Sequence, residues 1–364
     1  MHGTEQGGKA AQGVVNDAGI RRMVAQGQVK CPPTVAGQVQ PASLDLRLGH
    51  RAYRLMSSFL PGKADMDDRL ADLSIHEFDL RDGMFLETDA VYMVELQESL
   101  ALPEDVCGKA NPKSSTGRLD VFVRLVAENA VEFDTVPSGY RGRLWLEIAP
   151  KTFPIKVRTG SRLAQMRFQR GSTRLSDAEL ASVHARDPLV DTPVPVLRNG
   201  LCLGVDLTPD ADGIVGWRAL RHTAAVDVDQ PGALDRHDYW EPLRVRRGGG
   251  LILAPGEFYI LASRESVTVP PDLAAEMVPF DAGVGEFRVH YAGFFDPGFG
   301  YGPGNASRGV LEVRAHDVPF LVEHGQGVAR LVYERMAELP EDVYGANLRS
   351  NYQGQGLKLG KHFK

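Results

Sequence analysis

The sequence predicts a mainly β protein of two similar halves with a few short helices. Its 364 residues include 39 glycines and 23 prolines, and these turn-forming residues separate short runs of β-forming residues. One helical pattern opens the chain, where Asp17 can cap a helix that ends near Gly27. Ile20, Met23 and Val24 give this helix an apolar face. Strands and turns account for most of the remaining pattern.

The second half of the chain repeats the first at a steady offset. The segment LETDAVYMVELQESLALPEDV begins at Leu86 and aligns with LAPGEFYILASRESVTVPPDL, which begins at Leu253. Further on, WLEI from Trp145 aligns with VLEV from Val310 at nearly the same offset. An offset that changes by only two residues across a region of loops predicts an internal duplication. The alternative is a pair of unrelated β-domains that share common turn residues.

A proline-rich join separates the two halves. Residues 171–200 contain a short helical pattern and then Pro188, Pro193 and Pro195, which favour extended chain over packed structure. We therefore expect four parts in the chain: a first domain at 1–170, a linker at 171–200, a second domain at 201–340 and a C-terminal segment at 341–364.

Composition excludes several classes of protein. A net charge of −6 argues against a general nucleic-acid binder, whose surface is basic. Cys31, Cys107 and Cys202 are too few and too scattered for a disulfide framework or a zinc knuckle, so we expect a reducing cytoplasm. The polar, glycine-rich N-terminus does not resemble a signal peptide, and no run of about 18 apolar residues predicts a membrane span.

Two distant segments together have the composition of a nucleotide site. Residues 113–118, KSSTGR, offer two cations, hydroxyls and a glycine turn, which can surround phosphate oxygens. Residues 344–356, YGANLRSNYQGQG, offer aromatic rings, amides and glycines, which suit a flap that orders over a ligand. Residues 113–118 alone also fit a solvated basic turn, so the prediction depends on the two segments being read together.

Two carboxylates between these segments have both a functional and an ordinary interpretation. Glu147 lies in an alternating strand, RLWLEIAP, where it could be a general acid–base or simply a residue on a wet face. Asp134 precedes a Pro-Ser-Gly turn, where it could bind a sugar hydroxyl or form the turn. Zinc-dependent nucleobase deaminases need a P-C-x-x-C pair, which this sequence lacks, and it has no Walker motif or GxGxxG fingerprint.

The order of these motifs resembles that of dCTP deaminases, in the dUTPase-like superfamily. The set runs from QPASLDLRLG at Gln40 through KSSTGR, Ala127, Asp134 and the Trp145–Glu147 triplet to YQGQG at Tyr352. The resemblance covers most of residues 14–170 and the C-terminus. It implies two tandem dUTPase-like distorted β-barrels, of jelly-roll type, that assemble around a threefold. It also implies zinc-independent hydrolysis of dCTP to dUTP and ammonia.

The same resemblance assigns roles to individual residues. Glu147 would carry protons between water and the cytosine ring, while Arg118 and Ser114 would hold Glu147 and the attacking water. Lys113 stands where the family usually has arginine, and Asn351 where it usually has lysine. The substrate-binding positions that the resemblance implies are Lys113, Ser115, Thr116, Gly117, Ala127, Asp134, Trp145, Leu146, Tyr344, Asn351 and Gln355.

The chain departs from the single-domain family in its length and in its second half. It is about twice the usual length, and only the second half is followed by the YQGQ flap. That half retains Glu312, but its counterpart of KSSTGR is DAGVGE at residues 281–286, whose acids would repel a triphosphate. We therefore expect the first barrel to supply Glu147 and the other catalytic residues and the second barrel to supply the lid, with little catalytic role for Glu312.

The expected ligands and partners follow from the same resemblance. Magnesium would arrive on the triphosphate, bound through phosphates and water, and no protein metal site is expected. The substrate would be dCTP, dTTP is a candidate inhibitor, and a homo-oligomer is expected, either a trimer or a pseudo-hexameric assembly. Three alternatives remain at this stage: a dUTP pyrophosphatase, a bifunctional dCTP deaminase and dUTPase, and a non-catalytic nucleotide-binding protein.

Overall fold

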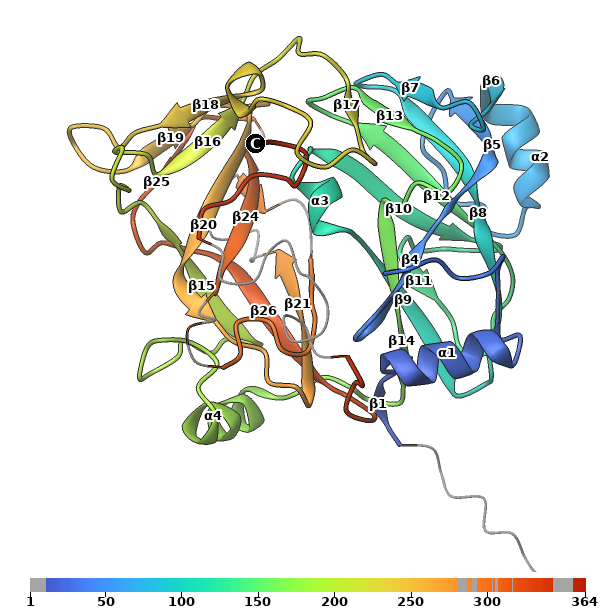
Figure 1. Ribbon diagram of the computed structural model, residues 1–364, viewed down its shortest axis with the longest axis horizontal. Coiled ribbons are helices and arrows are strands. Elements are labelled where there is room, and N and C mark those ends of the chain that lie inside the picture. The colour runs from blue at the N-terminus through green and yellow to red at the C-terminus, as the bar shows by residue number, and fades with distance from the viewer. Residues whose placement is uncertain are drawn as a thin grey trace, which may run out of the picture.

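The computed structural model describes residues 11–279, 287–289, 293–302, 304, 307–315, 317–342 and 356–364. It confirms the mainly β class: curled sheets form two units that lie side by side (Figure 1). The first unit comprises β1 to β14, coloured blue to green, and the second comprises β15 to β26, coloured green to red. None of the helices in the described part of the chain combines the length and apolarity that crossing a bilayer requires.

The first unit is formed by two six-stranded sheets that face each other. One has the order β11-β9-β14-β4-β3, with β1 beside β14, and the other has the order β10-β12-β8-β5-β6, with β2 beside β8. Its helices are α1 (Asp17–Ala25), α2 (Met66–Leu73) and the single turn α3 (Ser114–Gly117). Its strands are β1 (Gly13–Val14), β2 (Val29–Lys30), β3 (Val39–Gln40), β4 (Ser43–Leu46), β5 (Leu48–Leu55), β6 (Ser74–Asp79), β7 (Met84–Leu86), β8 (Val91–Ala101), β9 (Val106–Pro112), β10 (Val121–Ala127), β11 (Thr135–Val136), β12 (Arg141–Pro150), β13 (Ile155–Val157) and β14 (Ala164–Arg170).

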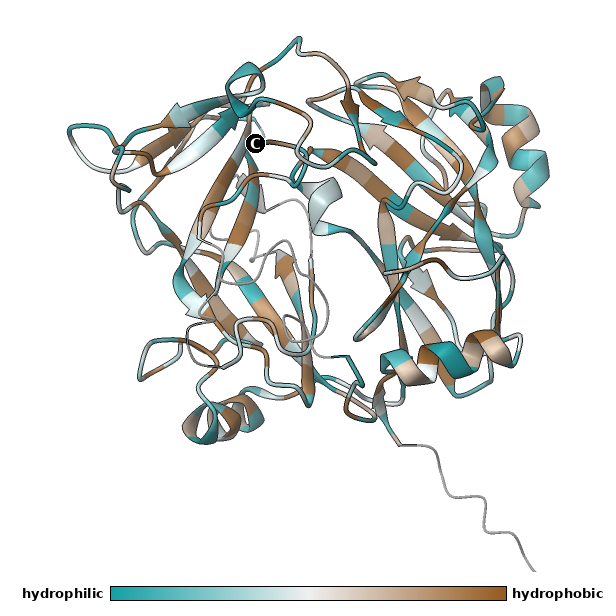
Figure 2. Ribbon diagram, in the orientation of Figure 1, coloured by the Kyte–Doolittle hydropathy of each residue, from teal (hydrophilic) through white to brown (hydrophobic). Residues whose placement is uncertain are grey.

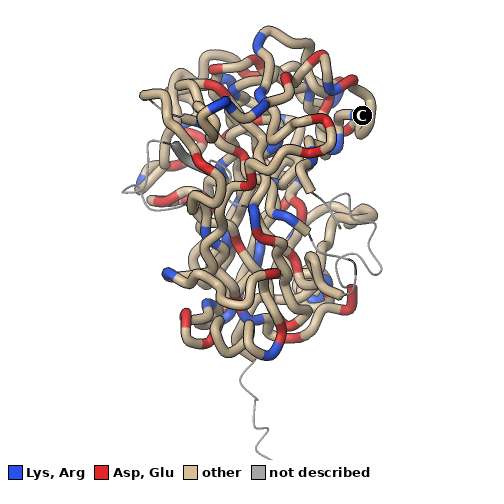
Figure 3. The backbone as a smooth tube through the Cα atoms, turned by 90° about the vertical axis from the view of Figure 1, so that its left-hand side faces the viewer, with Lys and Arg blue, Asp and Glu red and all other residues tan. Residues whose placement is uncertain are grey.

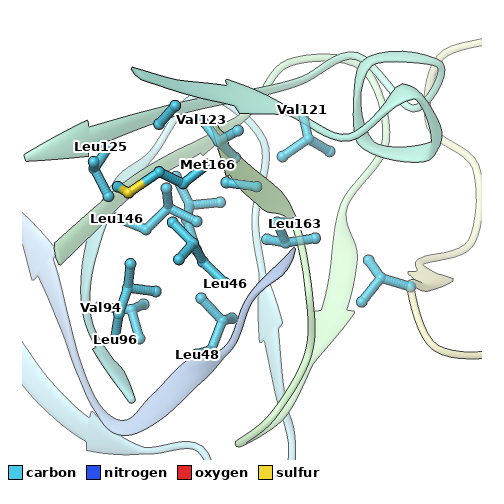
Figure 4. Packing of buried hydrophobic residues seen from close by; sticks show 14 of the residues in the cluster. Leu46, Leu48, Val94, Leu96, Val121, Val123, Leu125, Leu146, Leu163 and Met166 are labelled. Atoms are coloured by element: carbon cyan, nitrogen blue, oxygen red, sulfur yellow. The ribbon is translucent and has the colours of Figure 1, made fainter. Parts of the chain in front are cut away.

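The core of the first unit lies between these sheets. Buried residues alternate with more exposed ones along much of β8, β9 and β10, as the period of two predicts. Figure 4 shows Leu46 and Leu48 from one part of the chain meeting Val94, Leu146 and Met166 from others. In both units, hydrophobic residues (brown) are concentrated in the strands and hydrophilic residues (teal) in the loops (Figure 2).

The second unit has one large curled sheet. Its order is β18-β16-β20-β15-β26-β21-β23, and β24 pairs with both β20 and β22. A small sheet of β19 and β25 stands beside it. The elements are α4 (Asp177–Arg186), the 3-10 turn η1 (Arg236–Asp238), β15 (Leu201–Asp206), β16 (Gly216–Ala219), β17 (Val226–Asp227), β18 (Trp240–Leu243), β19 (Leu251–Leu253), β20 (Phe258–Val267), β21 (Leu273–Pro279), β22 (Phe287–Val289), β23 (Phe294–Phe295), β24 (Ser307–Ala315), β25 (Phe320–Val322) and β26 (Gly327–Arg335).

The same local contact recurs in the two units at the spacing seen in the sequence. The Tyr92 hydroxyl accepts a hydrogen bond from the backbone N–H of Glu87 at 3.0 Å. The Tyr259 hydroxyl accepts one from the backbone N–H of Ala254 at 2.8 Å. Ala254 follows Glu87, and Tyr259 follows Tyr92, by the same number of residues that separates Leu86 from Leu253. Residues that align in the two halves of the sequence therefore make the same contact in the structure.

The segment expected to be a linker packs against the second unit. Ser176 and Glu179 form a capping box that begins α4. Leu180, Leu189 and Val190 are buried in the hydrophobic core of the second unit. The segment is therefore packed at Leu180, Leu189 and Val190, whereas Val194 and Val196, beside the later prolines, are exposed.

The contact between the two units has an apolar part, because one hydrophobic cluster includes residues of both, and a polar and charged part. The Lys109 ammonium pairs with Glu276 at 2.5 Å, and the Gln169 amide donates to Glu334 at 2.6 Å. Arg167 is fully buried there and donates to a backbone carbonyl of the second unit at 2.9 Å. Elsewhere, Lys and Arg are interspersed with Asp and Glu along the backbone and form no single basic stripe in the described part of the chain (Figure 3).

Candidate active site

The KSSTGR segment forms the short helix α3, which fixes its hydroxyls and amides in place. Lys113 is the N-cap residue, and the backbone N–H of Thr116 donates to its carbonyl at 2.8 Å. The Thr116 hydroxyl donates to the carbonyl of Leu163 at 2.8 Å, which ties α3 to the start of β14. A tight turn was expected here, and the structure closes it into one helical turn.

Two cations beside α3 share one buried carboxylate. Asp45 lies in the buried strand β4 and forms an ion pair with Lys113. The Arg162 guanidinium lies 3.3 Å from the same Asp45 oxygen. One buried carboxylate therefore interacts with two cations at the edge of α3, and cations of this kind can bind an anion.

Arg118, at the end of α3, faces the second unit. It is buried, and its Nη1 donates to the backbone carbonyl of Lys358 at 3.0 Å. Its charge also acts on Glu312, a buried residue of β24. Burial raises the pKa of Glu312 to about 8, while the nearby Arg118 charge opposes that rise and Asp120 adds to it. The charge of Arg118 therefore acts on Glu312 across the junction of the two units.

Asp296 of the second unit faces the same region. Its carboxylate lies 3.6 Å from the guanidinium of Arg167. Burial raises the pKa of Asp296; the charges of Arg167 and Lys113 lower it, and that of Asp45 raises it. Asp296 of the second unit thus acts on Lys113 of the first, and the junction brings carboxylates of both units near the cations and hydroxyls of α3.

Glu147 has a different partner. It lies opposite Arg124 in the register of β12 and β10, and Arg124 Nε donates to its carboxylate at 2.9 Å. The same guanidinium donates to the Ser58 hydroxyl at 2.6 Å and lies 3.7 Å from the centre of the Phe133 ring. One oxygen of Glu147 is therefore paired within its own unit, while the other, Oε2, is buried without a hydrogen-bond partner among the described residues.

Asp134 is beside this cluster and has the geometry of a turn residue. Its backbone φ is +62°, and its carboxylate accepts the backbone N–H of Leu125 at 2.7 Å. Burial raises the pKa of Asp134 to about 7, although this hydrogen bond and the Arg124 charge oppose the rise. The turn-forming interpretation of Asp134 accounts for these contacts.

The structure does not bring Arg118 and Ser114 to Glu147, contrary to the expectation from the resemblance. Arg124 lies opposite Glu147, whereas Val121, at the start of β10, lies opposite Pro150. Three residues of strand span about 10 Å, and Arg118 lies beyond that start. The two groups therefore lie at different ends of β10.

The other predicted residues of the first unit lie in packed surroundings. Leu146 points into the core of the unit (Figure 4). Trp145 is buried with Met66 and Leu70 of α2, and Ala127 is buried at the end of β10. Ser115, Thr116 and Gly117 are buried in α3. Tyr344, Asn351 and Gln355, together with residues 281–286, lie outside the described residues.

Comparison with known proteins identifies the family. The model of the "2'-deoxycytidine 5'-triphosphate deaminase (DCD) N-terminal domain" matches residues 11–172, and the model of the C-terminal domain of the same deaminase matches residues 176–363. The chain belongs to the 2'-deoxycytidine 5'-triphosphate deaminase family.

Relatives with known names agree with this membership. A crystal structure of 2'-deoxycytidine 5'-triphosphate deaminase from Agrobacterium tumefaciens is 54% identical, has a TM-score of 0.88 and covers 91% of this chain and 100% of its own. A dCTP deaminase, dUMP-forming, from Kocuria rhizophila is 31% identical over 43% of this chain and 78% of its own. A dCTP deaminase from Haloarcula marismortui is 29% identical over 43% of this chain and 79% of its own.

Sequence reasoning did not predict that Glu312 and Asp296 lie at the junction of the units. The signal was present, because Phe295-Asp296 repeats Phe133-Asp134 and Glu312 repeats Glu147. The resemblance assigns all catalytic residues to the first barrel. In the structure, the charged groups at the junction come from both units.

Proposed function

We propose that this protein hydrolyses dCTP to dUTP and ammonia at a site between its two units. The observations that carry the proposal are the burial of Glu312 in the second unit, the charge of Arg118 from the first unit that acts on it, and the ion pair between Arg314 and Asp120, which joins the same two segments. Membership of the dCTP deaminase family supports the reaction, and the junction supports its location. The acid–base role first expected of Glu147 is better supported for Glu312.

Glu312 has the proton affinity that the reaction needs. A carboxyl whose pKa is about 8 carries a proton at neutral pH and can give it to N3 of cytosine. The resulting carboxylate then takes a proton from water as the hydroxide adds to C4. Glu312 next protonates the exocyclic amine and takes the proton of the C4 hydroxyl, so that the C4–N bond breaks and ammonia leaves. Glu312 ends protonated, as it began.

Arg118 stabilises the transient carboxylate of this cycle. Glu312 is negative only after it has given its proton away, and a neighbouring guanidinium stabilises that state without supplying a proton. A buried carboxyl with no cation near it would hold its proton too tightly to act as an acid at neutral pH. The balance between burial and the Arg118 charge therefore keeps the pKa of Glu312 close to neutral pH.

The first unit supplies the phosphate side of the site. Lys113 and Arg162 provide charge, and α3 provides hydroxyls and amide groups for phosphate oxygens. Asp296 would accept a hydrogen bond from the deoxyribose hydroxyl, the role first expected of Asp134. Magnesium would arrive on the triphosphate and be held by phosphates and water. The absence of a deaminase-type cysteine pair from the sequence supports a zinc-independent route.

The further properties expected from sequence remain proposals. We expect a cytoplasmic enzyme that forms a homo-oligomer, with dTTP as a candidate inhibitor. The corresponding strands of the two units support an origin by internal duplication, since Tyr92 and Tyr259 make the same contact at the offset of the sequence repeat.

Product analysis tests the proposed reaction against its rivals. Purified protein with dCTP and magnesium is expected to release dUTP and ammonia in equal amounts, without pyrophosphate. Release of dUMP and pyrophosphate would instead identify the bifunctional enzyme, whose name is carried by relatives that match less than half of this chain. Hydrolysis of dUTP without turnover of dCTP, or no turnover of either nucleotide, would contradict the proposal.

A further inference from the structure

Arg167 reaches from the first unit into the second. It lies in β14, its side chain is completely buried, and its guanidinium bridges two strands of the second unit. Its Nη1 donates to the backbone carbonyl of Ala275 in β21 at 2.9 Å, and its Nη2 donates to that of Phe295 in β23 at 2.8 Å. Ala275 and Phe295 are partners in the register of these strands. One planar group therefore holds both strands at the end of β23.

Further contacts fix the guanidinium itself. It lies over the ring of Phe294, 4.0 Å from the ring centre. One oxygen of Glu334, in β26, accepts a hydrogen bond from Nη1 at 3.4 Å. The other oxygen of Glu334 accepts from Gln169 at 2.6 Å and from Thr173 at 2.7 Å. Arg167 is therefore held by side chains and backbone groups on every side, and its position is well defined.

Asp296 directly follows the residue that Arg167 holds. Its carboxylate oxygen Oδ1 lies 3.6 Å from Arg167 Nη2, which is too far for a hydrogen bond. Among the described residues, this buried oxygen has no hydrogen-bond donor. A buried acceptor without a donor is unfavourable, unless a ligand supplies the donor. Arg167 thus fixes the backbone beside Asp296 but leaves one carboxylate oxygen available to a hydroxyl.

The corresponding aspartate of the first unit has a different environment. Asp134 already accepts a backbone N–H of its own unit at 2.7 Å. At the offset that aligns Glu147 with Glu312, Arg167 aligns with Val332, which carries no charge. The second unit therefore has no arginine at the position from which Arg167 reaches its neighbour. The bridging arginine belongs to the junction that contains Asp296 and has no equivalent for Asp134.

We propose that Arg167 is a positioning residue, which holds Asp296 in place for the deoxyribose hydroxyl and so determines the preference for nucleotides that carry this hydroxyl. This inference rests on the proposed function, because that function places the sugar beside Asp296. A site with a fixed, unpaired acceptor rejects an analogue that lacks the hydroxyl, since the acceptor then stays buried without a partner.

The test compares dCTP with 2',3'-dideoxycytidine 5'-triphosphate, which lacks this hydroxyl. A hydrogen bond to a charged group corresponds to roughly a 10- to 100-fold change, so we expect the wild-type kcat/KM to favour dCTP by that factor. Arg167→Lys keeps the charge but cannot hold both backbone carbonyls, and we expect it to narrow the preference by roughly five- to tenfold. Asp296→Ala is expected to abolish the preference.

Arg170→Lys is the matched control. Arg170 lies in the same strand and pairs with Asp105 within the first unit, so we expect the preference to stay as in the wild type. A purely structural role for Arg167 would lower kcat/KM for both nucleotides alike. An unchanged preference in Arg167→Lys would therefore overturn the inference.

Two further measurements cover the remaining cases. If Arg167→Lys does not fold, a crystal structure of Glu312→Gln with dCTP decides: we expect the deoxyribose hydroxyl to donate to Asp296, and a hydroxyl bonded elsewhere would overturn the inference. If the wild type deaminates neither nucleotide, the proposed function fails. Calorimetric Kd values for the two nucleotides then measure the same preference, which Arg167→Lys must narrow if the role of Arg167 is to stand.

Discussion

Glu147 and Glu312 occupy corresponding places on β12 and β24, yet their surroundings differ. Arg124, on the adjacent strand, donates directly to the Glu147 carboxylate. Glu312 is instead buried at the junction of the units, where burial raises its pKa and Arg118 of the other unit opposes the rise. Glu147 is therefore paired with a cation of its own sheet. The pKa of Glu312 is instead influenced by a cation from the other unit.

The residues that precede the two glutamates also differ in what they pack against. Trp145, two residues before Glu147, is buried under α2, with the Arg143 guanidinium 4.7 Å from its ring centre. Val310, two residues before Glu312, belongs to the apolar cluster that joins the two units. The first unit fills the space around its carboxylate with its own side chains. The groups that act on Glu312, Arg118 and Asp120, come instead from the first unit.

The largest effect that we expect is the loss of turnover in Glu312→Gln. The amide keeps the size of the side chain but can neither give nor take the proton, and general acid–base groups contribute roughly 10²–10⁴ in rate. Steady-state kcat for dCTP, with Kd for dCTP measured by calorimetry, checks the result. We expect binding to survive. A kcat within about threefold of the wild type would remove Glu312 from the mechanism.

Glu147→Gln is the matched control. We expect its kcat to stay within about threefold of the wild type, because Glu147 lies with Arg124 and away from the junction. The variant should unfold more easily by roughly 1–3 kcal/mol, since Arg124 loses its ionic partner. Denaturant unfolding measures this change. Loss of turnover as severe as that of Glu312→Gln would return the catalytic role to Glu147.

The smallest effect concerns the dependence of stability on pH. The pKa of Glu312 is about 8 in the folded protein, above its ordinary value of 4.5, so the folded state binds a proton more tightly than the unfolded state. That contribution is fully present below about pH 4.5 and is lost as pH rises to about 8. Glu312→Gln should therefore gain melting temperature relative to the wild type between pH 5 and pH 8. A difference that is constant across this range would show that the pKa of this carboxyl is not raised.

Sequence patterns predicted what is local in this molecule. The β class and the opening helix follow from turn residues and apolar spacing, and the structure has the mainly β fold and a helix over Asp17–Ala25. The phosphate-binding role of KSSTGR follows from its composition and its order among the motifs, and it stays a prediction. These inferences depend on sequence patterns alone and not on how distant parts of the chain pack.

The pairing of groups across units could not be predicted in the same way. WLE and VLE have the same local pattern, so nothing within either segment indicates which glutamate Arg118 will face. That depends on how the two units dock and on the register that places Arg124 opposite Glu147. The burial of Leu189 and Val190 likewise depends on a surface of the second unit that their own segment does not reveal.

A crystal structure of Glu312→Gln with dCTP and magnesium tests the central claim most directly. The variant should bind dCTP without consuming it, so the position of the base can be observed. We predict cytosine beside residue 312 and Arg118, with the triphosphate at Lys113 and α3. Cytosine beside Glu147, enclosed by the first unit alone, would contradict the account.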